Sequence, residues 1–180
     1  MKAIIMSIVF LIMAASEVQS QDAELPLLIQ LNDKAEASVL GNLADGKLMP
    51  DLSWAWSSSN ACFPETQVRK FTGTHQLFEF EIPARTEVQI ILTPKDKKHD
   101  MSLYAYMIGI GTDAIVPNLS RCIRCEADHK WDRPKAGKTQ DHRRIVGDIL
   151  AIQNPYKVII GVAGANGLAE GEFTLEIKRK

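Results

Sequence analysis

The feature that most constrains the fold is a series of short segments in which apolar and polar residues alternate. Alternation with a period of two is typical of β-strands that bury one face. The segments are LSWAWS (52–57), QLFEFEI (76–82), EVQIILT (87–93), MSLYAYMIG (101–109), RIVGDILAI (144–152), YKVIIGVAG (156–164) and EFTLEIKRK (172–180). Because the second half of the chain shows no helical periodicity, this pattern predicts an all-β fold, an antiparallel β-sandwich or jelly roll in a single domain.

Two short connections predict which strands are neighbours. The residues Pro-Ala-Arg-Thr at 83–86 form a short turn, so the strands at 76–82 and 87–93 should pair antiparallel. The sequence GANGLAEG at 164–171 is rich in residues that accept positive φ and predicts a hairpin loop. The strand at 101–109 is apolar on both faces, which predicts a central place in its sheet.

Two segments fit this pattern less well. Residues 21–46 form a lead segment that suits either a strand with a loop or a short helix. The β-sandwich domain is expected to span 47–180 and to contain a long loop at 109–144, whose second half is rich in charged residues. Long loops in compact domains are commonly functional or held by disulfides, so this loop is a candidate contact surface.

The N-terminus predicts export. Lys2 precedes an apolar run at 3–15, and Ser20 is followed by the polar Gln21, the arrangement of a secretory signal peptide at 1–20. An apolar run of about thirteen residues is shorter than the roughly twenty that a membrane-spanning helix needs. We therefore expect a periplasmic or extracellular protein without a membrane span. Its net charge of −1 gives no general attraction for nucleic acid.

Three cysteines allow three kinds of chemistry. Cys122 and Cys125 have C-x-x-C spacing, which suits a redox site, and with Cys62 and His129 they have the ligand types of a zinc site. In an oxidising compartment, a structural disulfide is the favoured interpretation. A link from Cys62 to Cys122 or Cys125 would close a loop of about sixty residues and stabilise the fold by roughly 4 kcal/mol. A local bridge between Cys122 and Cys125 is the alternative.

Four segments resemble a known family. They are FTGTHQLFEFEIPARTEVQIILTP, DMSLYAYMIG, NPYKVIIGVAG and GEFTLEIKRK. From about residue 70 onward their order resembles the bacterial pre-peptidase C-terminal domain, a β-sandwich that commonly accompanies secreted hydrolases. The resemblance consists of framework residues, so it implies a fold more than a chemistry. The cysteines in 109–144 depart from the family pattern.

The resemblance also bears on calcium, which some members of the family bind, as others bind an extracellular polymer. Asp100, Leu103 and Tyr104 match the Asp-x-x-Leu-Tyr element of the family. Where a second acidic residue is often found, this chain has Met101 or Ser102, so the resemblance supports calcium only weakly. Leu103 and Tyr104 are expected to be core and sheet-face residues.

The sequence contains no recognisable catalytic motif. His75, His99, His129 and His142 have no second histidine two or four positions away, and no nucleophile elbow, phosphate-binding loop or metalloprotease motif is present. We therefore predict a protein that is not an enzyme and has no cofactor or bound metal.

Binding is the predicted activity. Trp131, flanked by Lys130 and Arg133 in the long loop, is the candidate contact residue, whereas Trp54 and Trp56 share a strand face and are expected to be core. The sequence thus predicts an exported, non-enzymatic binding or envelope-associated module for an extracellular polymer or envelope protein. The alternatives are an accessory domain of a separately encoded secreted hydrolase, or an orphan hydrolase.

Overall fold

The computed structural model describes residues 25–56, 62–119, 122–130, 136–137 and 140–180. The predicted signal peptide at 1–20 lies outside these residues. The elements, in chain order, are β1 (Leu27–Leu28), β2 (Ala37–Asn42), η1 (Leu43–Asp45), β3 (Lys47–Leu48), η2 (Ser53–Ala55), η3 (Glu65–Phe71), β4 (Thr74–Ile82), β5 (Thr86–Pro94), β6 (Met101–Gly109), β7 (Arg124–Asp128), β8 (Arg144–Ala151), β9 (Tyr156–Gly164) and β10 (Glu172–Arg179), where η marks a 3₁₀-helix.

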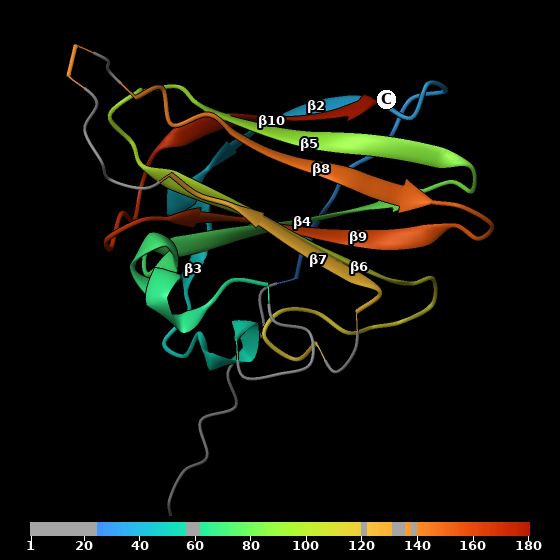
Figure 1. The fold of residues 1–180 in the computed structure, drawn as a ribbon, viewed down its shortest axis with the longest axis horizontal. Helices are drawn as coiled ribbons and strands as arrows, with labels where there is room; N and C mark the ends of the chain where they lie inside the picture. The colour runs from blue at the N-terminus through green and yellow to red at the C-terminus, as the bar shows by residue number, and fades with distance from the viewer. Residues whose placement is uncertain (1–24, 57–61, 120–121, 131–135, 138–139) are drawn as a thin grey trace, which may run out of the picture.

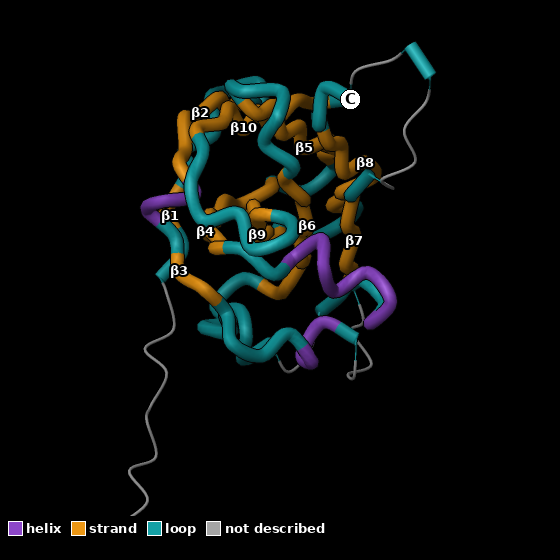
Figure 2. Tube along the Cα trace, turned by 90° about the vertical axis from the view of Figure 1, so that its left-hand side faces the viewer, coloured by secondary structure: helices purple, strands orange, loops and turns teal. Residues whose placement is uncertain are grey.

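The strands form two sheets that pack face to face (Figures 1 and 2). Sheet A has the order β1-β4-β9-β6-β7, with β3 beside β4, and sheet B has the order β2-β10-β5-β8. The strand pairs are antiparallel except β1 with β4, which is parallel. This arrangement confirms the predicted all-β antiparallel sandwich.

The main core fills the space between the two sheets. Alternate residues of β4 and β5 supply much of it, and these side chains are at most 2% exposed: Phe78, Phe80, Ile82, Val88, Ile90 and Leu92. Burial of such a side chain stabilises the fold by about 1.5–3 kcal/mol. The alternation in these two segments therefore corresponds to a face that is buried in the core.

The connections between these strands differ from the prediction. β4 and β5 are not neighbours, because 83–86 carries the chain from sheet A to sheet B. The segment 164–171 does the same between β9 and β10, so it is not a hairpin loop. Arg85 adopts a φ of 57° in the first connection, and its backbone N–H donates to the carbonyl of Ile152 at 3.2 Å. Either type of connection lets both strands face one core.

A second hydrophobic cluster covers the outer face of sheet A. Phe63, Phe71, Tyr104 and Tyr106 belong to it, and the rings of Phe63 and Phe71 stack at 3.7 Å between centroids. Because this cluster covers β6 from outside while the main core covers it from inside, β6 is buried on both faces. β6 lies between β9 and β7, which confirms its predicted central position.

The described part of the strand predicted at 52–57, residues 52–56, is not a strand. Ser53–Ala55 forms the 3₁₀-helix η2, and the Asp51 carboxylate accepts hydrogen bonds from the backbone N–H and hydroxyl of Ser53 at 2.8 and 2.9 Å. Trp54 and Trp56 are half-buried against the second cluster. Contact with this aromatic cluster and the Asp51 turn outweigh the strand preference of the alternating pattern.

The remaining predictions concern the lead segment and the long loop. Within 21–46 the structure places the two-residue β1, the strand β2 and the short η1, so a leading strand was the better of the two alternatives. Within 109–144 it places β7, which pairs with β6 and forms one edge of sheet A. The long loop is therefore a strand over Arg124–Asp128, contrary to the prediction.

Candidate functional site

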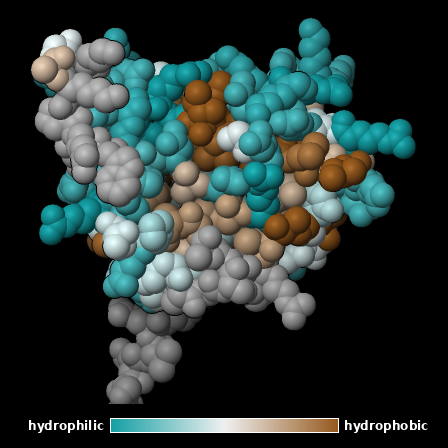
Figure 3. All heavy atoms as spheres, viewed as in Figure 1, coloured by the Kyte–Doolittle hydropathy of each residue, from teal (hydrophilic) through white to brown (hydrophobic). Residues whose placement is uncertain are grey.

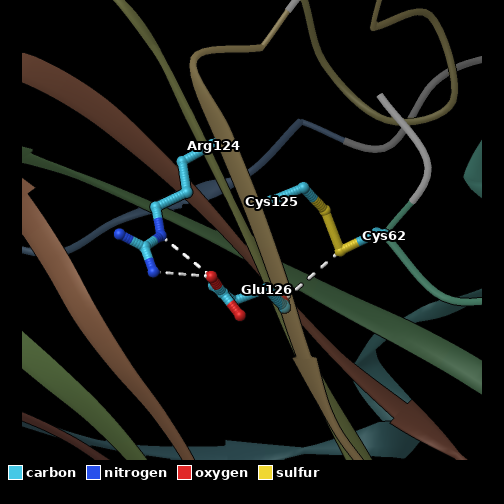
Figure 4. The surroundings of a disulfide bond; sticks show 4 residues. All are labelled: Cys62, Arg124, Cys125 and Glu126. Carbon is cyan, nitrogen blue, oxygen red and sulfur yellow. Dashed lines mark hydrogen bonds and ion pairs between the residues drawn. A yellow bond between two sulfur atoms is a disulfide. The ribbon is translucent and has the colours of Figure 1, made fainter. Parts of the chain in front are cut away.

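A disulfide joins β7, an edge strand of sheet A, to the segment that covers the outer face of this sheet (Figure 4). Cys62 is bonded to Cys125 of β7, with 5.1 Å between their Cα atoms and a sequence separation of 63 residues. The adjacent residues Arg124 and Glu126 form an ion pair at 2.8 Å. The predicted disulfide is confirmed, and it is the long-range link rather than the local C-x-x-C bridge.

The third cysteine remains a thiol. Cys122 is half-buried, and burial raises the pKa of its thiol. A thiol with a raised pKa is a weak nucleophile at neutral pH, which argues against the redox interpretation. The zinc interpretation fails as well, because Cys62 and Cys125 use their sulfur atoms in the disulfide. Within the described ranges, no group of three or more His, Cys, Asp or Glu side chains is arranged to hold a metal ion.

A partly buried ionic network holds the end of the long loop against the start of β6. Asp100 Oδ1 accepts a hydrogen bond from Arg144 at 2.6 Å and lies 3.0 Å from His142 Nδ1, and its Oδ2 accepts from Lys70 at 3.2 Å. Arg144 is fully buried, and this burial lowers the pKa of its guanidinium. The Asp100 carboxylate is thus surrounded by basic groups, an environment that repels Ca²⁺.

The outer face of sheet B carries a groove of about 690 Å³. Thr174 of β10 is paired with Leu40 of β2 on one side and with Thr93 of β5 on the other. Arg143 extends this row, since the next residue, Arg144, is paired with the residue before Thr93. The groove therefore runs perpendicular to the strands, from β2 across β10 and β5 to the residue that precedes β8. Lys97, from the β5–β6 connection, and Asp141 also line it.

Two of the cations that line the groove have no carboxylate partner in the part of the chain that the structure describes. Glu172 pairs with Lys95 at 2.5 Å, and Asp141 pairs with Lys130. This pairing lowers the pKa of the Asp141 carboxyl to about 2, so Asp141 stays charged. Lys97 and Arg143 are exposed and form no ion pair with any residue that the structure describes.

The predicted contact residues are only partly represented. Trp131 and Arg133 lie outside the described residues. Lys130 is described, and its ion pair with Asp141 places it beside the groove. Sequence analysis missed Lys97 and Arg143, because each belongs to a run of mixed charges, KDKKHD or DHRR, that is typical of solvated loop tips. Only the fold shows that these two runs lie at the same end of sheet B.

A separate apolar surface follows the edge strand β8. Ile145, Leu150 and Ile152 are 40%, 39% and 65% exposed. Figure 3 shows hydrophobic residues along β8 and near β7 on the face that is turned to the viewer. The backbone N–H of Ile145 donates to the Asp128 carboxylate of β7 at 2.8 Å, so the edges of the two sheets are joined here.

Comparison with known proteins gives structural neighbours only. No family model matches the chain, and no curated protein matches it. Among the described residues, no helix is long and apolar enough to cross a membrane.

Two solved structures are similar to this chain. One is the pre-peptidase C-terminal domain of a collagenase from Bacillus anthracis, with 11% identity, a TM-score of 0.41, and coverage of 87% of this chain and 97% of that one. The other is PliG from Aeromonas hydrophila, a periplasmic inhibitor of g-type lysozyme, with 9% identity, a TM-score of 0.38, and coverage of 86% of this chain and 96% of that one.

Proposed function

We propose that the protein is an exported, non-enzymatic binding module that contacts its partner through the groove of sheet B. The observation that carries this proposal is that two cations, Lys97 and Arg143, line a groove of about 690 Å³ and form no ion pair with the described residues. The N-terminal sequence and the disulfide between Cys62 and Cys125 support a periplasmic or extracellular location.

The chemistry of the groove favours binding over catalysis. Covalent catalysis needs a nucleophile within reach of a base, and none of the described lining residues is a histidine, cysteine or serine. The hydroxyl groups in the groove belong to Thr93 and Thr174, whose register places them in the middle of the row. The acidic residues Asp141 and Glu172 are engaged by lysines, so neither is a free general base.

The proposed contact surface retains part of the long loop. Asp141 and Arg143 come from the end of 109–144, and Lys130 is bound to Asp141. Sheet B supplies the rest, which the sequence did not predict. The contact role of Trp131 stays a prediction: replacement of Trp131 by alanine should weaken binding and leave the melting temperature nearly unchanged.

Site-specific photo-crosslinking tests the proposal. A photoreactive phenylalanine analogue is placed at Leu40 or Thr174, which line the groove and are not the cations, in cells that export the protein. The exposed Glu81 is the control position on another element. We expect a discrete adduct from the two groove positions and none from Glu81. Absence of adducts from the groove, or turnover of ester, peptide or glycoside substrates by the purified protein, would overturn the proposal.

A further inference from the structure

We infer that the groove of sheet B binds an extended, acidic segment of a partner protein, in which an apolar residue and a carboxylate are about four positions apart. This inference rests on the proposed function and specifies the class of ligand. It is drawn from the register of the four strands, the charges at the rim and the side chains of the floor.

The two ends of the groove differ in chemistry. At the β2 end, Leu40 is 84% exposed, a high value for a leucine that lies within a sheet. At the β8 end, Arg143 continues the row of Thr93 and Thr174, and Lys97 lines the same groove. An apolar contact at one end and a cationic contact at the other define a direction for the ligand.

The width of the sheet sets the spacing within the ligand. Leu40 lies on β2, and Arg143 immediately precedes β8. These are the outermost strands of the four-stranded sheet, so three strand spacings, about 14 Å, separate the two residues. An extended chain advances about 3.3–3.6 Å per residue, so about four residues span this distance. An apolar side chain on Leu40 and a carboxylate at Arg143 therefore belong to residues about four positions apart.

The floor of the groove favours a peptide over a polysaccharide. Between the two ends, the hydroxyl groups of Thr93 and Thr174 can donate hydrogen bonds to, or accept them from, the backbone of an extended segment. Sugar rings usually stack on exposed aromatic side chains. The aromatic lining residue in the described part of the chain is Phe173, which is 1% exposed and belongs to the main core.

Peptide binding tests the inference. The probe is a fluorescein-labelled peptide, Leu-Ser-Gly-Ser-Glu-Glu, and its binding to the full-length secreted protein is measured by fluorescence polarisation. We expect Lys97→Glu and Arg143→Glu each to weaken binding about ten-fold, because each loses one attraction and gains one repulsion. Lys47→Glu, an exposed charge inversion on β3 of sheet A, is the matched control and should leave binding unchanged.

Two further probes distinguish the alternatives. The same peptide with glutamine in place of glutamate, and a version with leucine next to the glutamates, should both bind more weakly. Equal binding of these versions, equal effects of the three charge inversions, or preference for polygalacturonate over the peptide would overturn the inference. If crosslinks form at the groove while the acidic peptide does not bind, the inference fails and the proposed function stands; if neither is seen, both fail.

Discussion

His75 and Tyr104 share a buried hydrogen bond that fixes the protonation state of the histidine. The Nε2 of His75 lies 2.7 Å from the Phe71 carbonyl, which can only accept, so Nε2 carries the proton. In the neutral ring Nδ1 then carries no proton, so it accepts from the Tyr104 hydroxyl at 2.9 Å. Burial disfavours the charged imidazolium and lowers the pKa of His75 to about 4.

The first prediction is that His75 makes the fold sensitive to acid. In the unfolded chain the histidine has a pKa of 6.5, against about 4 in the folded state. Between these values the unfolded state binds more protons, so stability falls as the pH falls from 6.5 to about 4. The shift corresponds to about 3 kcal/mol at full effect. Urea unfolding at pH 7 and at pH 4.5 measures the loss.

The matched variant is His75→Gln, because a glutamine amide can donate to the Phe71 carbonyl and does not titrate in this range. It should be less stable than the wild type at pH 7 and should lose less stability between pH 7 and pH 4.5. The same loss in both proteins would show that His75 is not the acid-sensitive group.

A second prediction concerns Gly161, which is paired with Tyr104 across sheet A. A Cβ atom added at Gly161 would lie 1.9 Å from the Tyr104 ring, so the ring occupies the space of the absent side chain. Gly161→Ala should therefore displace Tyr104 and reduce the free energy of unfolding by about 1–3 kcal/mol. Gly147→Ala on the edge strand β8 is the control, since its Cβ would meet only the flexible Lys180 amine, at 3.5 Å. Chemical denaturation measures the free energy of unfolding of both variants. An equal loss in the two variants would contradict the prediction.

The sequence predicted the strands better than their connections. β4 and β5 were recognisable because one face of each strand is buried, and burial imposes alternation. A hairpin within one sheet and a crossing between two sheets both place Phe80 and Ile90 in the same core. The alternating pattern is therefore the same for a hairpin and for a crossing. Only the packing of strands that are distant in the sequence distinguishes the two connections.

The candidate site was harder to predict for a related reason. The disulfide could be anticipated from the residue type and the expected oxidising compartment, since thiol chemistry and export restrict what Cys62 can do. Lys97 and Arg143 carry no such restriction, because surface cations occur in most loops. Whether these cations line a common groove depends on the strand register of sheet B, a long-range property that no local pattern encodes.

A third prediction addresses the partly buried network around Asp100. Asp100→Asn leaves the fully buried guanidinium of Arg144 without its carboxylate, and loss of one partner of a buried pair costs about 3–5 kcal/mol. Asp141→Asn is the control, because the Asp141 side chain is 57% exposed and its pair with half-buried Lys130 is screened by solvent, so it should contribute less than about 1 kcal/mol. Thermal melts would contradict the assignment if the two variants lost the same stability.

The last prediction is that the disulfide stabilises the fold by closing a long loop. Cys62 and Cys125 are separated by 63 residues, and a loop of this length restricts the unfolded chain by about 4 kcal/mol. Cys62→Ser and Cys125→Ser should each lose stability of this order, and reduction of the wild type should produce a similar loss. Cys122→Ser removes a half-buried thiol that takes no part in the disulfide. This variant should therefore keep the Cys62–Cys125 bond and be nearly as stable as the wild type. Denaturation with and without a reductant, together with peptide mapping, measures these differences. A bond from Cys62 to Cys122 in the wild type, or an equal loss in all three variants, would contradict the observed pairing.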